Sequence, residues 1–183
     1  TWLTGPLSAE NHPFVEHFKF MKQFEDENTI VKQTMPAPAQ LLAELDREDN
    51  SIKTSAIYPN MEELMQDVAA AYRTVIQELY EAGCRNIQFD DCTWGMFCDT
   101  NYWNARQHDN VSLESEAEKY LRVNNLAMEG KPADLTIATH VCRGNYHSTY
   151  ACSGAYDAVA PYLFANEKAD AFYLEFDDER SGS

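Results

Sequence analysis

Apolar residues recur at helical spacing in several long segments of the chain. Between residues 61 and 83 they follow a period close to 3.6, and Gly83 stands where a helix C-cap glycine is expected. The same spacing recurs between residues 112 and 128, where Ser112 is a favourable N-cap. These patterns predict two amphipathic helices, and shorter apolar faces predict two more at residues 12–24 and 155–165.

Short runs rich in β-branched and aromatic residues alternate with these helices. Such runs, bounded by polar or turn-forming residues, are typical of buried strands. One run follows the helix at residues 61–83 directly, and another follows the helix at residues 112–128. The predicted strands cover residues 1–4, 30–34, 86–90, 135–140 and 171–175, with a Met-Pro-Ala-Pro turn after the second.

The alternation of helices and strands predicts an α/β fold with parallel strands. About five β/α units fit into 183 residues, whereas a closed TIM (β/α)8 barrel needs eight strands and typically about 250 residues. Neither end of the sequence resembles a domain boundary, because residues 1–4 already form a predicted strand. We therefore expect residues 1–183 to form part of a TIM barrel, as a partial catalytic domain. An open five-stranded sheet is the alternative.

Composition and charge narrow the classes of function. The hydrophobic content of 44% is that of an ordinary globular protein, and no apolar run approaches the roughly 20 residues of a membrane span. A net charge of -16 disfavours nucleic acid and anionic membrane surfaces as partners. The first residues show no signal-peptide pattern, and the five cysteines lack the spacing of a secreted disulfide framework. These features predict a cytoplasmic protein whose cysteines are free thiols or metal ligands.

Candidate metal ligands stand where the later predicted strands end. His140 and Cys142 are two residues apart, so one side of a strand carries both an imidazole and a thiol, which are ligands that zinc prefers. Glu175 ends the next strand, and the carboxyl ends of parallel strands open onto a common face. We expect His140, Cys142 and Glu175 to supply three ligands of a zinc site that converts a substrate thiol to its thiolate. Asp90, which ends a neighbouring strand, is expected to bind an amino group of that substrate.

These residues also have purely structural interpretations. Asp90 or Asp91 can cap the segment that follows them, and Cys142 can be a small buried apolar residue. Glu175 can form an ion pair with Arg143 or Arg180 in place of a metal bond.

Neighbouring residues widen the range of interpretations. His147 or Cys152 can replace one of the three ligands, because both follow Cys142 closely. Trp94, Tyr102 and Trp103 form an aromatic cluster after Asp90, which either stacks on a pterin or a substrate or packs within a loop.

Several short motifs are shared with one enzyme family. They are NIQFDD at residues 86–91, THVC at residues 139–142, FYLE at residues 172–175 and VKQTMPAP at residues 31–38. Together they resemble the C-terminal catalytic barrel of cobalamin-independent methionine synthase. HVCRGN at residues 140–145 and DDERSG at residues 177–182 are closer still to the short, single-barrel bacterial methionine-synthase-like proteins, and the resemblance covers nearly the whole chain.

The resemblance implies a zinc-dependent methyltransferase. In that family a methyl group passes from a methyltetrahydrofolate to the thiolate of homocysteine, which gives methionine; another methyl donor is the alternative. Carried over by motif, His140, Cys142 and Glu175 are implied as zinc ligands, and Asp90 as the contact to the amino group of homocysteine. The resemblance leaves the oligomeric state open.

The chain departs from the family pattern in ways that affect the expected chemistry. The family's Asp-Glu-Pro is Asp90-Asp91-Cys92 here, and residues 93–96 lack the acidic residue that contacts folate in the family. The family's fourth ligand, a cysteine, and its proton-donating histidine are expected beyond residue 183, so these residues alone are expected to be incomplete for catalysis. Two further functions stay open, a metal-free barrel of the uroporphyrinogen decarboxylase type and a non-catalytic ligand-binding relative.

Overall fold

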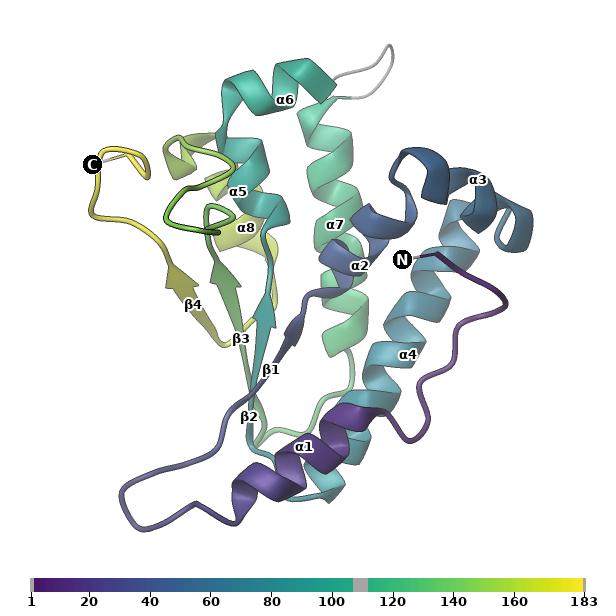
Figure 1. Cartoon of the computed structure of the whole chain (residues 1–183), viewed down its shortest axis with the longest axis vertical. Helices are drawn as coiled ribbons and strands as arrows, with labels where there is room; N and C mark the ends of the chain where they lie inside the picture. Colours follow the sequence, from purple (N-terminus) through teal and green to yellow (C-terminus); the bar gives the residue numbers. More distant parts are fainter. Residues whose placement is uncertain (1, 107–111, 183) are drawn as a thin grey trace.

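The computed structural model describes residues 2–106 and 112–182, which form an α/β fold (Figure 1). Four strands lie in one parallel sheet in the order β1-β2-β3-β4. The strands are β1 (Gln33–Pro36), β2 (Asn86–Asp90), β3 (Thr136–Val141) and β4 (Ala171–Leu174). The helices are α1 (Pro13–Lys22), α2 (Pro38–Leu45), α3 (Glu48–Ile57), α4 (Met61–Glu81), α5 (Thr93–Cys98), α6 (Thr100–Arg106), α7 (Leu113–Met128) and α8 (Ala160–Asn166), with a short 3-10 helix η1 (Tyr156–Ala158).

The four strands run in the same direction, so their carboxyl ends lie along one edge of the sheet (Figure 1). The register pairs Pro36 with Asp90, Asp90 with His140, and His140 with Tyr173. The ladder continues past β2, because the amide of Asp91 donates to the carbonyl of His140 at 2.8 Å. Residues that follow Asp90 and His140 are therefore held side by side.

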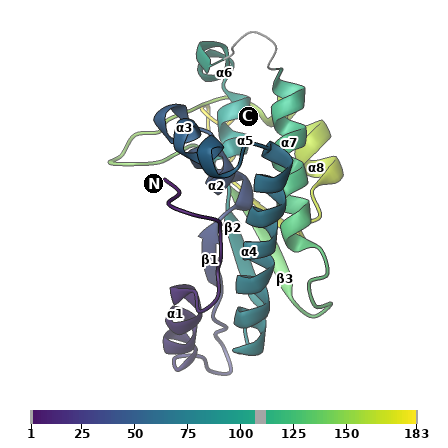
Figure 2. The same ribbon diagram turned by 90° about the vertical axis from the view of Figure 1, so that its right-hand side faces the viewer.

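Helices α4 and α7 pack on one face of the sheet and form the main core with it (Figure 2). Side chains alternate along a strand, and Ile87, Phe89 and Ile137 point toward these helices and are buried. A second apolar cluster, which includes Trp94 and Leu163, joins α5 and α8 to the end of β3. None of the helices in the described part of the chain is long and apolar enough to cross a membrane.

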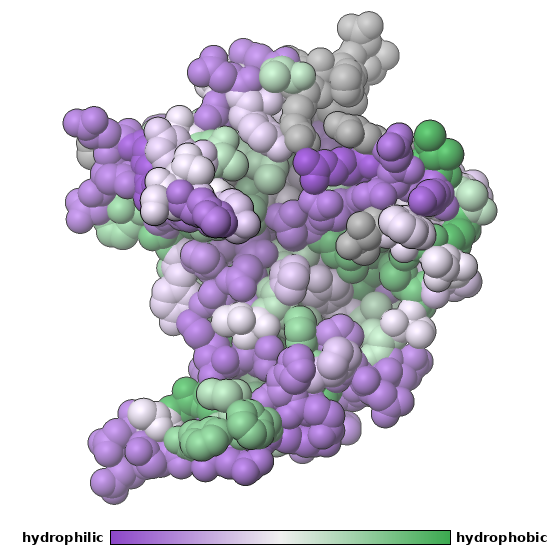
Figure 3. Space-filling view, viewed as in Figure 1, coloured by the Kyte–Doolittle hydropathy of each residue, from purple (hydrophilic) through white to green (hydrophobic). Residues whose placement is uncertain are grey.

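The opposite face of the sheet is polar. Gln88, Asp90 and His140 alternate with the buried strand residues and so point to this side. Nζ of Lys32 donates to Oε1 of Gln88 at 2.6 Å and lies 4.5 Å from the ring centroid of Tyr173, so Lys32 crosses the face from β1 toward β4. Figure 3 shows a largely hydrophilic surface on the side drawn, with an apolar patch at its lower end near α1.

The α/β class, the parallel strands and the long predicted helices are confirmed. Helix α4 ends just before Gly83, which adopts a left-handed φ of 96°. Helix α7 begins after Ser112, whose side chain accepts the amide of Ser115 at 3.1 Å within a capping box. Helix α1 falls within the segment predicted at residues 12–24. Helix α8 occupies the later part of the segment predicted at residues 155–165 and extends it by one residue, with the short η1 before it.

Two of the predicted strands differ from the structure. Residues 2–4 form no strand, and the Trp2 ring instead lies 3.9 Å from Nζ of Lys53. The strand predicted at residues 30–34 begins later, because Val31 still belongs to a loop in which its amide donates to Oε1 of Glu25 at 2.9 Å. The five β/α units are therefore not confirmed. Closure into a TIM barrel stays a prediction.

Four helices have no counterpart in the sequence prediction. Helix α2 lies where the Met-Pro-Ala-Pro segment predicts a turn, and it begins with Pro38, a residue that favours the first helical turn. Helix α3 is mostly polar, so it shows no clear apolar stripe. Helices α5 and α6 have only six and seven residues, too few for a helical period to stand out.

Candidate functional site

Asp90 and His140 form a side-chain pair at the carboxyl edge of the sheet. They are Cα partners in β2 and β3, and both point to the polar face because Phe89 and Thr139 are buried on the other. Nδ1 of His140 lies 2.9 Å from Oδ1 of Asp90, and the side-chain amide of Gln88 donates to the same oxygen at 2.7 Å. The carboxylate thus fixes the orientation of the imidazole and leaves its Nε2 pointing away.

Cys142 lies beside Cys92 at the same edge. The two Sγ atoms are 3.1 Å apart, and the amide of Gly144 donates to Sγ of Cys142 at 3.4 Å. The hydrogen bond from Cys92 lowers the pKa of Cys142 to about 6. The same contact raises the pKa of Cys92, which favours Cys142 over Cys92 as the sulfur that carries negative charge.

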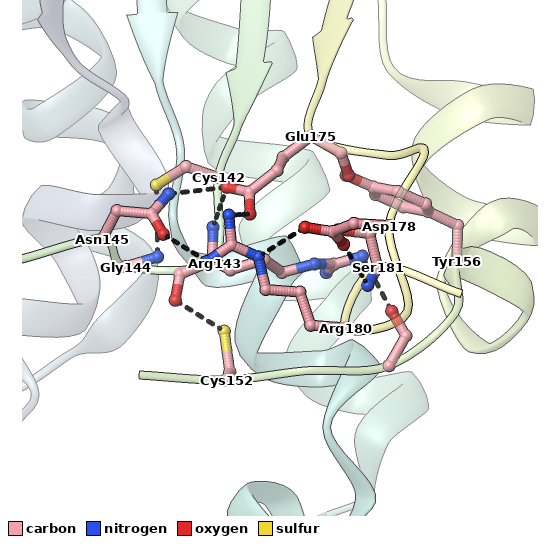
Figure 4. Close-up of polar contacts among 11 residues, drawn as sticks. Cys142, Arg143, Gly144, Asn145, Cys152, Tyr156, Glu175, Asp178, Arg180 and Ser181 are labelled. Carbon is pink, nitrogen blue, oxygen red and sulfur yellow. Dashed lines mark hydrogen bonds and ion pairs between the residues drawn. The ribbon is translucent and has the colours of Figure 1, made fainter. Parts of the chain in front are cut away.

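Glu175 follows β4, and its side chain is held by three partners (Figure 4). Its Oε2 accepts the backbone amide of Arg143 at 3.1 Å and the side-chain amide of Asn145 at 2.6 Å. Its Oε1 lies 2.7 Å from Nη2 of Arg180. The ion-pair interpretation of Glu175 is therefore confirmed for Arg180, whereas Arg143 contacts Glu175 through its backbone.

The structure brings the three predicted zinc ligands to one edge without gathering them into a closed metal site. His140 lies in β3, Cys142 directly follows it, and Glu175 directly follows β4. Within residues 2–106 and 112–182, no group of three His, Cys, Asp or Glu side chains is arranged to hold a metal ion. Each predicted ligand instead has a local partner, and the ligand role stays a prediction.

A buried acidic network lies behind this edge. Oδ1 of Asp91 accepts the amide of Thr93 at 3.0 Å, and its Oδ2 accepts the side-chain amide of Asn124 at 2.8 Å. Glu167 accepts the hydroxyl of Thr139. Burial raises the pKa of Asp91, and burial together with the charge of Asp91 raises the pKa of Glu167 to about 8. The capping interpretation is confirmed for Asp91, and Glu167 is a proton-holding group that the sequence did not reveal.

Trp94 and Trp103, two of the aromatic residues that follow Asp90, pack within the protein. Trp94 is fully buried and lies edge-on to Phe97, with ring centroids 6.0 Å apart. Trp103 packs edge-on against the same Phe97 at 5.3 Å. The packing interpretation therefore holds for Trp94, which has no exposed face for a pterin or a substrate.

Cys152 and His147, considered as substitute ligands, occupy different environments. Cys152 is buried, and its thiol donates to the carbonyl of Arg143 at 3.5 Å. His147 is exposed in the loop after β3 and packs edge-on against Tyr146.

Cys92 is the neighbour of Cys142 that the sequence patterns did not single out. The sequence does contain a clue to this contact, because Cys92 follows Asp90 by two residues just as Cys142 follows His140. Because Asp90 and His140 are register partners, equal offsets bring the two cysteines together.

The chain is similar to two proteins from Bacillus subtilis (strain 168), the uncharacterized proteins YxjH and YxjG. YxjH is 35% identical over 99% of this chain and 46% of its own length. YxjG is 32% identical over 98% of this chain and 46% of its own length. The chain therefore spans about half the length of the curated relatives it matches. No protein-family profile matches the chain.

A solved structure from Listeria monocytogenes, provisionally named a vitamin-B12 independent methionine synthase, superimposes with a TM-score of 0.71 at 34% identity, covering 97% of this chain and 48% of that one. The predicted resemblance to B12-independent methionine synthases is confirmed. A second methionine synthase of this kind, from Shewanella sp. W3-18-1 in complex with selenomethionine, shares the fold with a TM-score of 0.62 at 22% identity, over 97% of this chain and 46% of its own. The chain thus matches roughly half of each of these proteins.

Proposed function

We propose that this methionine-synthase-like chain contributes a zinc site that activates the thiol of homocysteine for methylation, with methionine as the product. The supporting observation is the placement of His140, Cys142 and Glu175 at the carboxyl edge of one parallel sheet. The 34% identity with the Listeria protein supports the same class of reaction. Because the chain spans 48% of that protein, the complete reaction is proposed only together with the fourth ligand and the proton donor that the family resemblance implies.

The donor atoms at this edge fit zinc. His140 directs Nδ1 to Asp90, a carboxylate–imidazole arrangement that commonly supports a metal-binding histidine and leaves Nε2 for the metal. The lowered pKa of Cys142 favours the thiolate, which is the form that binds zinc. Glu175 offers carboxylate oxygens, which zinc also accepts as ligands. To bind zinc, Oε1 would release the guanidinium of Arg180 and bind the metal in its place.

Substrate activation and substrate binding are assigned to different groups at this site. Zinc, when bound, would favour deprotonation of the homocysteine thiol and hold the thiolate in a fixed orientation. The two side-chain contacts of Asp90 with described residues, from Gln88 and His140, both use Oδ1. Its Oδ2 can therefore receive the amino group of homocysteine while Oδ1 keeps the imidazole in place. One carboxylate thus aligns a ligand and the substrate.

A methyltetrahydrofolate is the proposed methyl donor, by resemblance to the family. Trp94 cannot stack on its pterin ring, because the indole is buried in the core. Residues 93–96 also have no acidic side chain to contact the pterin. The identity of the donor therefore has to be tested among several compounds.

Product formation tests the proposal. The chain, together with the segment that supplies the fourth ligand and the proton donor, is supplied with zinc, homocysteine and, in separate reactions, methyltetrahydrofolate, its polyglutamate form, S-adenosylmethionine or S-methylmethionine. Methionine is measured by mass spectrometry. We expect zinc-dependent methionine from at least one donor, and its loss in Cys142→Ser. Cys84→Ser is the matched control, since the Cys84 thiol donates to the carbonyl of Asn86 at the opposite end of β2. Homocysteine binding without methionine from any donor would favour a non-catalytic ligand-binding protein.

A further inference from the structure

Four of the five cysteines gather around the carboxyl end of β3. Cys92 and Cys142 are in contact, Cys152 bonds to the carbonyl of Arg143, and Cys98 interacts with the Arg143 side chain. All five cysteines are free thiols in the structure. In a protein that keeps free thiols, a close pair of sulfurs is a site where reversible oxidation can occur.

The strand register brings the side chains of Cys92 and Cys142 together. Asp90 and His140 are register partners on adjacent parallel strands, and each cysteine follows its partner residue by two positions. The ladder extends one residue beyond this pair, since the amide of Asp91 donates to the carbonyl of His140 at 2.8 Å, and this holds the two following segments together. The Sγ atoms already lie 3.1 Å apart, so bond formation needs only a small side-chain rotation.

The remaining cysteines are less suited to pair with Cys142. Cys152 is 2% exposed, and its thiol is directed to the Arg143 carbonyl at 3.5 Å. Cys98 is also buried. Cys92 and Cys142, by contrast, are both partly exposed and accessible to a small oxidant.

We infer that Cys92 and Cys142 form a reversible disulfide in response to hydroperoxides. The Cys142 thiolate attacks one peroxide oxygen, which breaks the O–O bond and gives a sulfenic acid and hydroxide. The Cys92 sulfur then attacks the sulfenic sulfur, forming the S–S bond as the second oxygen leaves as water. In total, two thiols and one hydrogen peroxide give one disulfide and two waters. Reduction by a dithiol restores both cysteines.

The disulfide would exclude zinc from the site, a consequence that rests on the proposed function. The Cys142 sulfur can be a zinc ligand only as a thiolate, and it is not a thiolate once it is bonded to Cys92. Zinc and the disulfide therefore compete for the same sulfur. Oxidation would switch methyl transfer off and reduction would restore it.

Peptide mapping of the peroxide-treated protein tests the inference. In metal-free wild-type protein we expect the free thiols to fall from five to three, with a 92–142 crosslink that dithiothreitol reverses. Cys152→Ser should keep the crosslink, whereas Cys92→Ser should lose it and show a Cys142 sulfenic acid that dimedone traps. A crosslink through Cys152 or Cys98, or irreversible oxidation of Cys142 in wild-type protein with Cys92 left free, would overturn the inference even if Cys92→Ser fails to fold.

A parallel experiment with zinc distinguishes the disulfide inference from the proposed zinc-dependent function. Zinc-loaded protein should form the crosslink more slowly than metal-free protein, and the oxidised protein should not take up zinc. If the crosslink forms but zinc never affects its rate, the disulfide stands and the assignment of Cys142 as a ligand fails. If zinc binds through Cys142 but no crosslink forms, the disulfide inference fails and the proposed function stands.

Discussion

At the scale of single residues, the pair of Asp90 and His140 links the strands to the proposed chemistry. The 2.9 Å contact between Oδ1 of Asp90 and Nδ1 of His140 is the arrangement that supports metal-binding histidines in other proteins. Asp90 thus has a positioning role beside its predicted contact with the substrate amino group.

Replacing this carboxylate should weaken zinc binding. Asp90→Asn is expected to lower zinc affinity by about 10–100-fold, because the amide orients the imidazole less firmly. Competition with a chromophoric chelator measures the affinity, and Asp134→Asn, which removes a carboxylate near Arg85 far from the site, is the control. An unchanged affinity combined with a higher KM for homocysteine would leave Asp90 with a substrate role alone.

The buried Glu167 predicts a specific pH dependence of stability. Its pKa is raised from 4.5 to about 8, so the folded state keeps a proton that the unfolded state releases. This contribution to stability is fully present below pH 4.5 and is lost as the pH rises through about 8. In Glu167→Gln the decline across this window should be smaller.

Urea unfolding at a series of pH values measures the effect. Glu63→Gln, at an exposed position on α4, is the matched control and should follow the wild-type profile. The buried-acid interpretation fails if Glu167→Gln shows the same loss of stability between pH 4.5 and about 8 as wild type.

At the scale of elements, Gly95 allows α5 to pack against the end of β3. A Cβ on Gly95 would lie 2.3 Å from the carbonyl oxygen of Cys142 and 3.3 Å from Sγ of Cys152. This close approach keeps α5, which follows Cys92, against the loop that carries Cys142. The short helix therefore sets the position of Cys92 beside Cys142.

Gly95→Ala should destabilise the protein. The clash with backbone is expected to cost about 1–3 kcal/mol in the free energy of unfolding, as overpacking typically does. Gly5→Ala, where an added Cβ meets nothing within 4 Å, should change it by less than about 0.5 kcal/mol. Equal free energies of unfolding for the two variants would show that α5 shifts without strain.

The helices and strands differ in how well the sequence predicts them. Helices α4 and α7 are long, have N-capping side chains and bury one apolar face, so the spacing of their apolar residues predicts them well. Helix α3 has no clear apolar face. Strand β1 begins later than its residues predict, because the preceding loop is held by the contact between Glu25 and Val31, which no local sequence pattern encodes. Short or polar elements depend on tertiary contacts and are therefore missed.

At the scale of the whole molecule, the parallel sheet explains why the candidate site could be located from the sequence. Asp90, His140 and Glu175 are far apart in sequence, yet strand direction alone brings them to one edge. Side-chain partners could be located only in part. The equal offsets of Cys92 and Cys142 from Asp90 and His140 leave a signal in the sequence, whereas the Arg180 ion pair depends on how the loop after β4 folds.

Zinc stoichiometry is the decisive measurement for the proposed metal site. The purified protein is loaded with zinc, dialysed, and analysed for metal by mass spectrometry alongside Cys142→Ser and the remote control Cys84→Ser. We predict one tightly held zinc per chain in wild type and Cys84→Ser, and loss of that zinc in Cys142→Ser. Retention of stoichiometric zinc in Cys142→Ser, or its absence from reduced wild-type protein, would contradict the assignment of a zinc site at this edge of the sheet.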